Sequence, residues 1–197
     1  MLVVAIETRA TALLKESGMG ERRAALGARA ANRLARLTRS ALTFVVAAAA
    51  LFGVEPGLAA SNKVRISNLA DVAFGTVANL SVDALQSQSV CVYADTNTSG
   101  YNITGIGTGP GGAFQLSSGA SSLSYDVMWS SSAGQSSGAQ LAPNVPLTGQ
   151  SSGATQQACN TGPATSASLI VVLRSVSLSS AAAGTYNGSL TLLIGPE

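Results

Sequence analysis

Beyond residue 60 the large apolar side chains recur at every second position, and this period of two restricts the chain to β-strands. The clearest example is residues 123–129, in which Leu, Tyr, Val and Trp occupy the odd positions and Ser124 and Asp126 stand between them. The last run alternates in the same way and places four large side chains on one face: Tyr186, Leu190, Leu192 and Ile194. Gly188 lies on that face too, which indicates a bulge or a close approach of backbone.

Five further segments have weaker strand patterns: residues 64–74, interrupted near Asn68, and residues 90–93, 101–106, 113–116 and 168–175. The last of these is apolar on both faces, as expected of a central strand. The loops at 130–139 and 149–162 are rich in Ser and Gly. The first is either a flexible linker or a hairpin tip, and we favour the tip because strand patterns resume on both sides. Short strands joined by such loops predict an all-β sandwich or barrel.

The charge of the chain is concentrated in front of this β-rich part. Eight of the eleven Lys and Arg residues precede residue 40, whereas after residue 60 three cationic residues face five acidic ones. The formal net charge of +2 therefore says little about the β-rich part, and we expect no nucleic-acid partner.

The front of the chain has the order of a secretory signal peptide. Three arginines, at 33, 36 and 39, precede an apolar run at 41–54, and small residues follow at Ala59 and Ala60. The run is shorter than the roughly 20 residues that span a membrane, so a signal peptide is favoured over an anchor. We therefore expect residues 1–60 to be an N-terminal extension plus signal peptide that is removed, and 61–197 to be the exported domain. Met19 is an alternative start of translation.

Two cysteines, Cys91 and Cys159, both lie in the expected exported domain. Because export leads to an oxidising compartment, we predict that they form one disulfide rather than remain free thiols. On the chain-entropy model, closing so long a loop stabilises the fold by about 4 kcal/mol.

The sequence offers no catalytic, metal-binding or cofactor-binding constellation. It contains no histidine, which removes the usual catalytic triads and most zinc sites. The glycine-rich stretch 105–112 leads into a strand rather than a helix, so it lacks the geometry of a phosphate loop. We expect neither an enzyme nor a cofactor. The aromatics Tyr125 and Trp129 are interpreted as core residues, with an exposed sugar-stacking platform as the alternative.

The order of several short elements resembles the spore coat protein U domain family, which includes subunits of archaic, Csu-type chaperone-usher pili. The elements are Val72-Ala-Phe74-Gly75, Ser89-Val-Cys91-Val, Tyr101-Asn-Ile-Thr-Gly, Leu123-Ser-Tyr125-Asp-Val127, and Ala183-Gly184-Thr-Tyr186-Asn-Gly-Ser-Leu190-Thr-Leu192. They are spread over nearly the whole exported part.

The resemblance implies an immunoglobulin-like β-sandwich that lacks one edge strand. In such subunits a periplasmic chaperone fills the open groove first, and a strand from another pilus subunit replaces it at an outer-membrane usher. Carried over to this chain, that donor-strand groove would be bordered by the last strand, with Tyr186, Leu190, Leu192 and Ile194 on its inner face. The alternative is an ordinary buried strand in a complete sandwich.

Two departures qualify the resemblance. Main subunits have a cysteine upstream of the Phe-Gly element, whereas this chain has none before Cys91. Only about nine residues, 61–69, precede the Phe-Gly element, which is short for a strand donated to another subunit. These residues either serve as a donated strand or form the first strand of the domain itself. We therefore expect a minor or terminal structural or adhesive subunit of a surface pilus (fimbrium), exported to the periplasm and then to the cell surface. The alternative is a self-complete secreted module that binds a surface or glycan.

Overall fold

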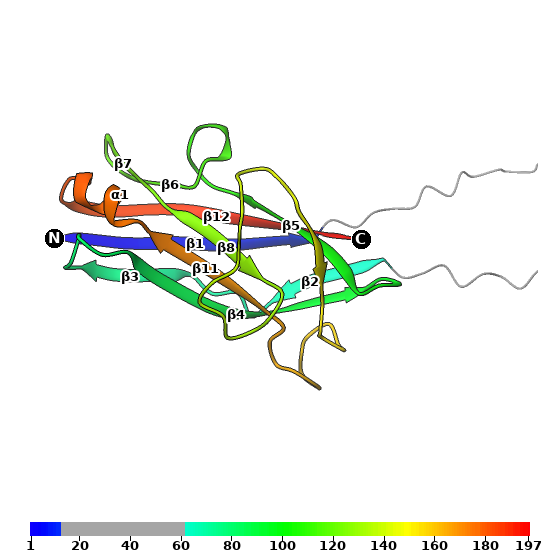
Figure 1. Ribbon diagram of the computed structural model, residues 1–197. Helices are drawn as coiled ribbons and strands as arrows, with labels where there is room; N and C mark the ends of the chain where they lie inside the picture. The colour runs from blue at the N-terminus through cyan, green and yellow to red at the C-terminus, as the bar shows by residue number, and fades with distance from the viewer. Residues whose placement is uncertain (13–61) are drawn as a thin grey trace, which may run out of the picture. The chain divides into compact units, whose positions relative to one another are not determined.

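The computed structural model describes residues 1–12 and 62–197, which form two β-sheets packed face to face (Figure 1). The expected all-β sandwich is thereby confirmed. The expected signal segment, with its arginines, apolar run and cleavage site, lies outside the described residues. Among the described residues, no helix has the length and apolar character needed to cross a membrane.

The first sheet has the order β10-β5-β12-β1-β3, and a β6–β7 hairpin extends it beside β12. Its strands are β1 (Leu2–Ala12), β3 (Val72–Val77), β5 (Gly100–Ile106), β6 (Gln115–Ser118), β7 (Ser121–Ser124), β10 (Leu147–Ser151) and β12 (Gly184–Pro196). Between β5 and β6 lies a 3-10 turn (Pro110–Gly112), and before β12 a short helix, α1 (Ser175–Ser180), which the sequence patterns did not predict.

The second sheet has the order β2-β4-β11-β8-β9. Its strands are β2 (Lys63–Ser67), β4 (Ala84–Asp95), β8 (Asp126–Ser130), β9 (Ala139–Gln140) and β11 (Ala167–Leu173). Every residue of β11 is buried, as its two-faced apolar pattern predicted. The loop after β8 contacts the outer face of β11 at Ser168, whose hydroxyl accepts from the amide of Gln135 and donates to the carbonyl of Ser132. Because β8 and β9 pair antiparallel on either side of this Ser- and Gly-rich loop, the loop at 130–139 is a hairpin tip.

The core lies between the sheets and is built from the alternating positions. In residues 123–129 the four odd side chains are buried, although the strand is divided at Tyr125, whose amide donates to the carbonyl of Phe114. Trp129 and Tyr125 are 1% and 3% exposed, so their interpretation as core residues is confirmed. Neither presents a ring face to solvent for sugar stacking.

The predicted disulfide is present. Cys91 on β4 is bonded to Cys159 in the loop before β11, with their Cα atoms 6.0 Å apart. Both residues are buried and form a small cluster with Ala154, against which Tyr93 packs. The bridge therefore anchors the 152–166 loop to the second sheet.

The interruption near Asn68 divides the strand pattern predicted at residues 64–74 into two strands that belong to different sheets. Asn68 has a positive φ of 61°, a conformation that asparagine tolerates better than most residues. Before it, β2 pairs with β4 from Lys63↔Asp95 to Ser67↔Cys91. After it, β3 joins the first sheet. Residues Lys63–Ser67 thus form a strand of this sandwich.

Candidate strand-binding groove

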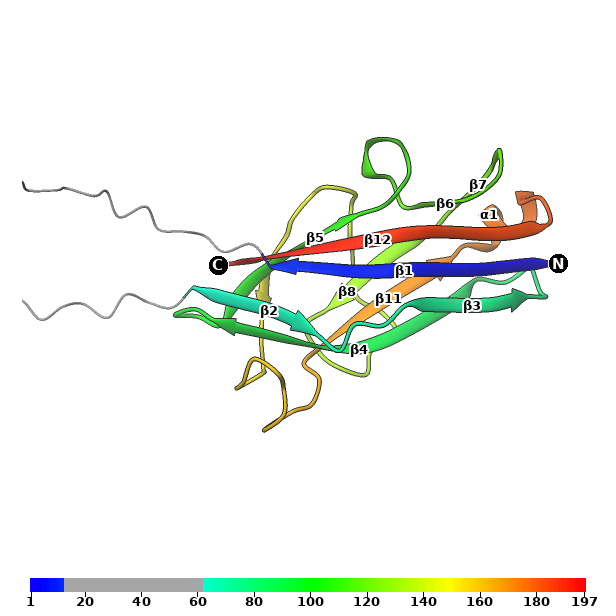
Figure 2. The same cartoon turned by 180° about the vertical axis from the view of Figure 1, so that it is seen from behind.

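Within the expected N-terminal extension, for which no strand was predicted, Leu2–Ala12 forms β1 between β12 and β3 (Figure 2). Its eleven residues pair in parallel with β12, from Leu2↔Gly184 to Ala12↔Ile194. On its other edge, Leu2 to Ile6 pair antiparallel with β3. Among the described strands, β3 has no other ladder partner, so β1 joins it to the rest of the first sheet.

The inward face of β1 carries three large apolar side chains. Leu2, Val4 and Ile6 are 4%, 1% and 0% exposed and belong to the main core. Burying an aliphatic side chain of this size stabilises by about 1.5–3 kcal/mol, before the entropy lost in ordering the segment. β1 thus fills the space between β3 and β12, which we call the groove, with large apolar side chains at alternate positions.

The four predicted groove residues all lie on the inward face of β12. Tyr186, Leu190, Leu192 and Ile194 are fully buried. Their partners on β1 are Val4, Thr8, Ala10 and Ala12, in that order. The three large side chains of β1 therefore lie along the first half of β12, opposite Gly184, Tyr186 and Gly188. Along the second half of β12, the smaller residues of β1 lie opposite Leu190, Leu192 and Ile194.

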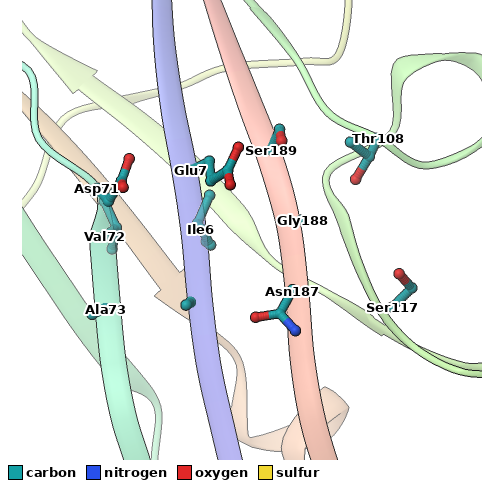
Figure 3. Close-up of a pocket in the computed structure, with 11 residues that line it drawn as sticks. Ile6, Glu7, Asp71, Val72, Ala73, Thr108, Ser117, Asn187, Gly188 and Ser189 are labelled. Carbon is teal, nitrogen blue, oxygen red and sulfur yellow. The ribbon is translucent and has the colours of Figure 1, made fainter.

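Gly188 makes room at the centre of the groove. A Cβ atom at this position would lie 2.8 Å from Cδ2 of the buried Leu116. The close approach predicted for Gly188 is therefore present, and its register partner is Ile6. Figure 3 shows Ile6 on β1 between Val72 on β3 and Gly188 on β12.

The opposite wall of the groove is β3, which the sequence analysis did not assign to the site. Val72 is part of the core, and Phe74 and Val77 pack against it. Since Phe74 and Val77 are three residues apart, a regular strand would place them on opposite faces. A bulge opposite Val4 and Ala5 removes this conflict, and Gly75 supplies the left-handed conformation with φ of 62°. The Phe-Gly element of the sequence thus marks this bulge.

The second half of β1 is held more weakly. Glu7 to Ala12 pair only with β12, and Arg9 to Ala12 are exposed. Thr8 is fixed by two contacts to the chain before β3: its amide donates to the Asp71 carboxylate at 3.0 Å, and its hydroxyl donates to the carbonyl of Ala70. The Glu7–Arg9 ion pair is largely exposed and adds little.

Two hollows border the inserted strand. The outer one, of about 500 Å³, is lined by Glu7, Asp71, Asn187 and Ser189, with Thr108 and Ser117 on its far side (Figure 3). The described residues contain no group of three His, Cys, Asp or Glu side chains able to hold a metal ion. A second hollow of about 390 Å³ lies beside Leu2 and is lined by mostly apolar residues: Val77, Ala78, Leu80, Ala181, Ala182 and Ala183.

Comparisons with known proteins add no further assignment. No protein-family model matches the chain, and no curated protein matches it.

Proposed function

We propose that this chain is a minor or terminal, structural or adhesive subunit of a surface pilus, which binds a strand of another polypeptide in the groove between β3 and β12. The chain would be exported to the periplasm and receive its strand first from a pilus chaperone. At an outer-membrane usher, another pilus subunit would then supply the strand. The basis is the order of the sequence elements together with the export signal and the groove.

One observation carries the proposal: the strand that completes the first sheet, β1, comes from outside the expected exported domain. Leu2–Ala12 precedes the expected signal peptide, whereas β3 and β12 follow it. If residues 1–60 are removed on export, β3 and β12 have no strand between them and the pockets of Leu2, Val4 and Ile6 are uncovered. Strand addition suits such a gap, because backbone hydrogen bonds give affinity and alternate side chains fill pockets.

The placement of β2 supports a minor or terminal position. A subunit within a polymer must both accept a strand and donate one. Lys63–Ser67 are paired with β4 inside this sandwich, so the start of the expected exported domain is already used. The domain accepts a strand without an evident one to give, which fits the end of a fibre.

The test is export of the full chain in a bacterial host with and without a chaperone and usher of this family. We expect the domain to be degraded or to aggregate without the chaperone and to purify as a one-to-one complex with it. A control chaperone, in which threonines replace the apolar residues of the donating strand, should fail to protect the domain. Equal accumulation of a soluble, stable monomer in all three cases would contradict the proposal.

A further inference from the structure

We propose that Ala70 and Asp71 form a register clamp beside the groove, which selects a partner strand by a hydroxyl side chain. The preferred strand carries Ser or Thr two positions after the last of three large apolar residues that stand at alternate positions. Residues 2–12 lie outside the expected exported domain, so β1 shows which strand the walls accept and is not the occupant there. This inference rests on the proposed function and names the chemistry of the partner strand.

Large apolar side chains alone leave the register of an inserted strand open. The inward positions of the groove, filled here by Leu2, Val4 and Ile6, recur at every second residue, because the side chains of a strand alternate between its two faces. A slip by two residues therefore keeps the same face inward and moves each apolar side chain to the next inward position. A contact that is made at one position only distinguishes these registers.

Such a contact stands where the ladder between β1 and β3 ends. Ile6↔Val72 is the last pair of that ladder. At the next inward position, the amide of Thr8 donates to the Asp71 carboxylate at 3.0 Å, and its hydroxyl donates to the carbonyl of Ala70. The side chains of Asp71 and Thr8 thus take over from the backbone ladder. Figure 3 shows Asp71 at the start of β3, directly before Val72 and beside Ile6 on β1.

Ala70 is held in place from the second sheet by Gln88 on β4. The amide of Ala70 donates to Oε1 of Gln88 at 2.8 Å, and its carbonyl accepts from Nε2 of Gln88 at 2.7 Å. Both backbone groups are thereby used, although the carbonyl keeps a second lone pair for one more donor. The residue of an inserted strand at this position therefore needs a side-chain donor, which Thr8 has and an aliphatic residue lacks.

The surroundings of this position favour a short hydroxyl side chain over other polar ones. An acidic side chain would meet the carboxylate of Asp71 and the carbonyl of Ala70 without a donor for either. A long charged side chain would lose water beside Leu190, which is the register partner of Thr8 and is fully buried. Ser and Thr supply one donor without a charge, so they fit this position best.

The test uses the exported domain in its complex with the chaperone, and a synthetic peptide of residues 2–12 competes for the groove. Native mass spectrometry measures the fraction of the domain that is bound to peptide as the peptide concentration rises. The comparison peptide combines Thr8→Ala with Ala10→Thr, so its composition stays the same while the hydroxyl moves by two residues. We expect half displacement to require roughly threefold to tenfold more of this exchanged peptide, as for one lost hydrogen bond. A Thr8→Ser peptide should match the wild-type peptide within about twofold, because it keeps the donor.

Two substitutions in the domain separate the roles of the clamp residues. Gln88→Ala frees Ala70 and should reduce the difference between the wild-type and exchanged peptides, an effect that a general loss of stability would not produce. Gln86→Ala is the matched control, since Gln86 is an exposed residue of the same strand, and it should leave the difference unchanged. Asp71→Ala should weaken both peptides by the same factor, because Asp71 accepts from a backbone amide that both peptides have.

The outcomes separate this inference from the proposed function. Equal displacement by the wild-type and exchanged peptides would overturn the clamp and leave the strand-binding groove intact. If the chaperone complex forms but no peptide displaces the chaperone, β1 does not represent the partner strand, and the clamp is overturned as well. If no chaperone complex forms, the proposed function fails and the clamp fails with it. The peptide comparison uses the domain without any substitution, so it stays decisive even if Gln88→Ala unfolds the domain.

Discussion

The indole Nε1 of Trp129 donates a hydrogen bond of 3.0 Å to the hydroxyl oxygen of Tyr101. The two rings meet edge to face, with centroids 6.5 Å apart. Tyr101 belongs to β5 in the first sheet and Trp129 to β8 in the second, and both side chains are buried. This polar contact therefore links the two sheets through the core.

Replacing Tyr101 by Phe should destabilise the fold by about 1–3 kcal/mol, because the indole N–H would stay buried without its acceptor. Equilibrium unfolding in urea measures the change. Tyr93→Phe is the matched control, since Tyr93 is only partly buried and lies on β4, and it should change the free energy of unfolding by less than about 0.5 kcal/mol. Equal effects of the two substitutions would contradict the role given to the Trp129 contact.

For the same substitution at Tyr125 we expect no loss of stability. Its hydroxyl is buried and has no hydrogen-bond partner among the described residues, while its ring packs against Phe114. Tyr125→Phe keeps the ring and removes a hydroxyl that is desolvated without compensation. We expect the free energy of unfolding to stay equal or to rise by up to about 1 kcal/mol. A loss comparable to that of Tyr101→Phe would show that the hydroxyl has a partner.

The buried tyrosines also predict a loss of stability in alkali. Burial raises the pKa of Tyr101 to about 12, although the hydrogen bond from Trp129 opposes the shift, and burial likewise raises the pKa of Tyr125. In the unfolded chain both titrate near about pH 10, so above this pH the unfolded state has lost protons that the folded state keeps. Stability should be unaffected by these groups below about pH 10 and should fall from there towards pH 12.

The change in the free energy of unfolding per pH unit tests this expectation. Each tyrosine contributes up to about 1.4 kcal/mol per pH unit between the unfolded and folded pKa values. Urea unfolding between pH 8 and 11.5 should therefore show a decline that Tyr125→Phe reduces by about half, through removal of one of two such groups. A stability that rises over this range would mean that the tyrosines are not held neutral in the fold.

The strands that were predictable from sequence are those whose pattern reflects local burial. The alternation in residues 123–129 and 186–194 identified the inward side chains, and the apolar run around Ile170 identified the central strand. The first half of β4 was missed because none of residues 84–89 is buried and four of the six are polar, so main-chain pairing with β11 holds them. Pairing of that kind leaves no hydrophobic signal.

Only one wall of the candidate groove, the one formed by β12, was predictable from the sequence. The inner face of β12 could be assigned because Leu190, Leu192 and Ile194 stand at every second position after Gly188. The wall formed by β3 was obscured by the bulge at Gly75, which breaks the period of two between Phe74 and Val77. The strand that fills the groove comes from more than 170 positions upstream of its β12 partners, as in the pair Leu2↔Gly184, and local periodicity carries no information on such a pairing.

The turn before β6 should be intolerant of any side chain at Gly107. A Cβ atom there would lie 2.1 Å from the carbonyl oxygen of Ala113, and backbone cannot give way as a flexible side chain does. Gly107→Ala should cost at least about 2 kcal/mol. Gly153→Ala is the control, because nothing lies within 4 Å of its Cβ position, and it should be nearly neutral. Similar urea midpoints for both variants would contradict this account of the turn.

The disulfide should stabilise the fold mainly by restricting the unfolded chain. Cys91 and Cys159 are 68 positions apart, so their bond closes a long loop in the unfolded chain. Replacing both by Ala should lower the free energy of unfolding by about 4 kcal/mol, most of it through greater freedom of the unfolded state. Treatment with a reductant should shift the wild-type urea midpoint towards that of the double variant and leave the variant unchanged. If reduction instead destabilised both proteins equally, the effect would not arise from this bond.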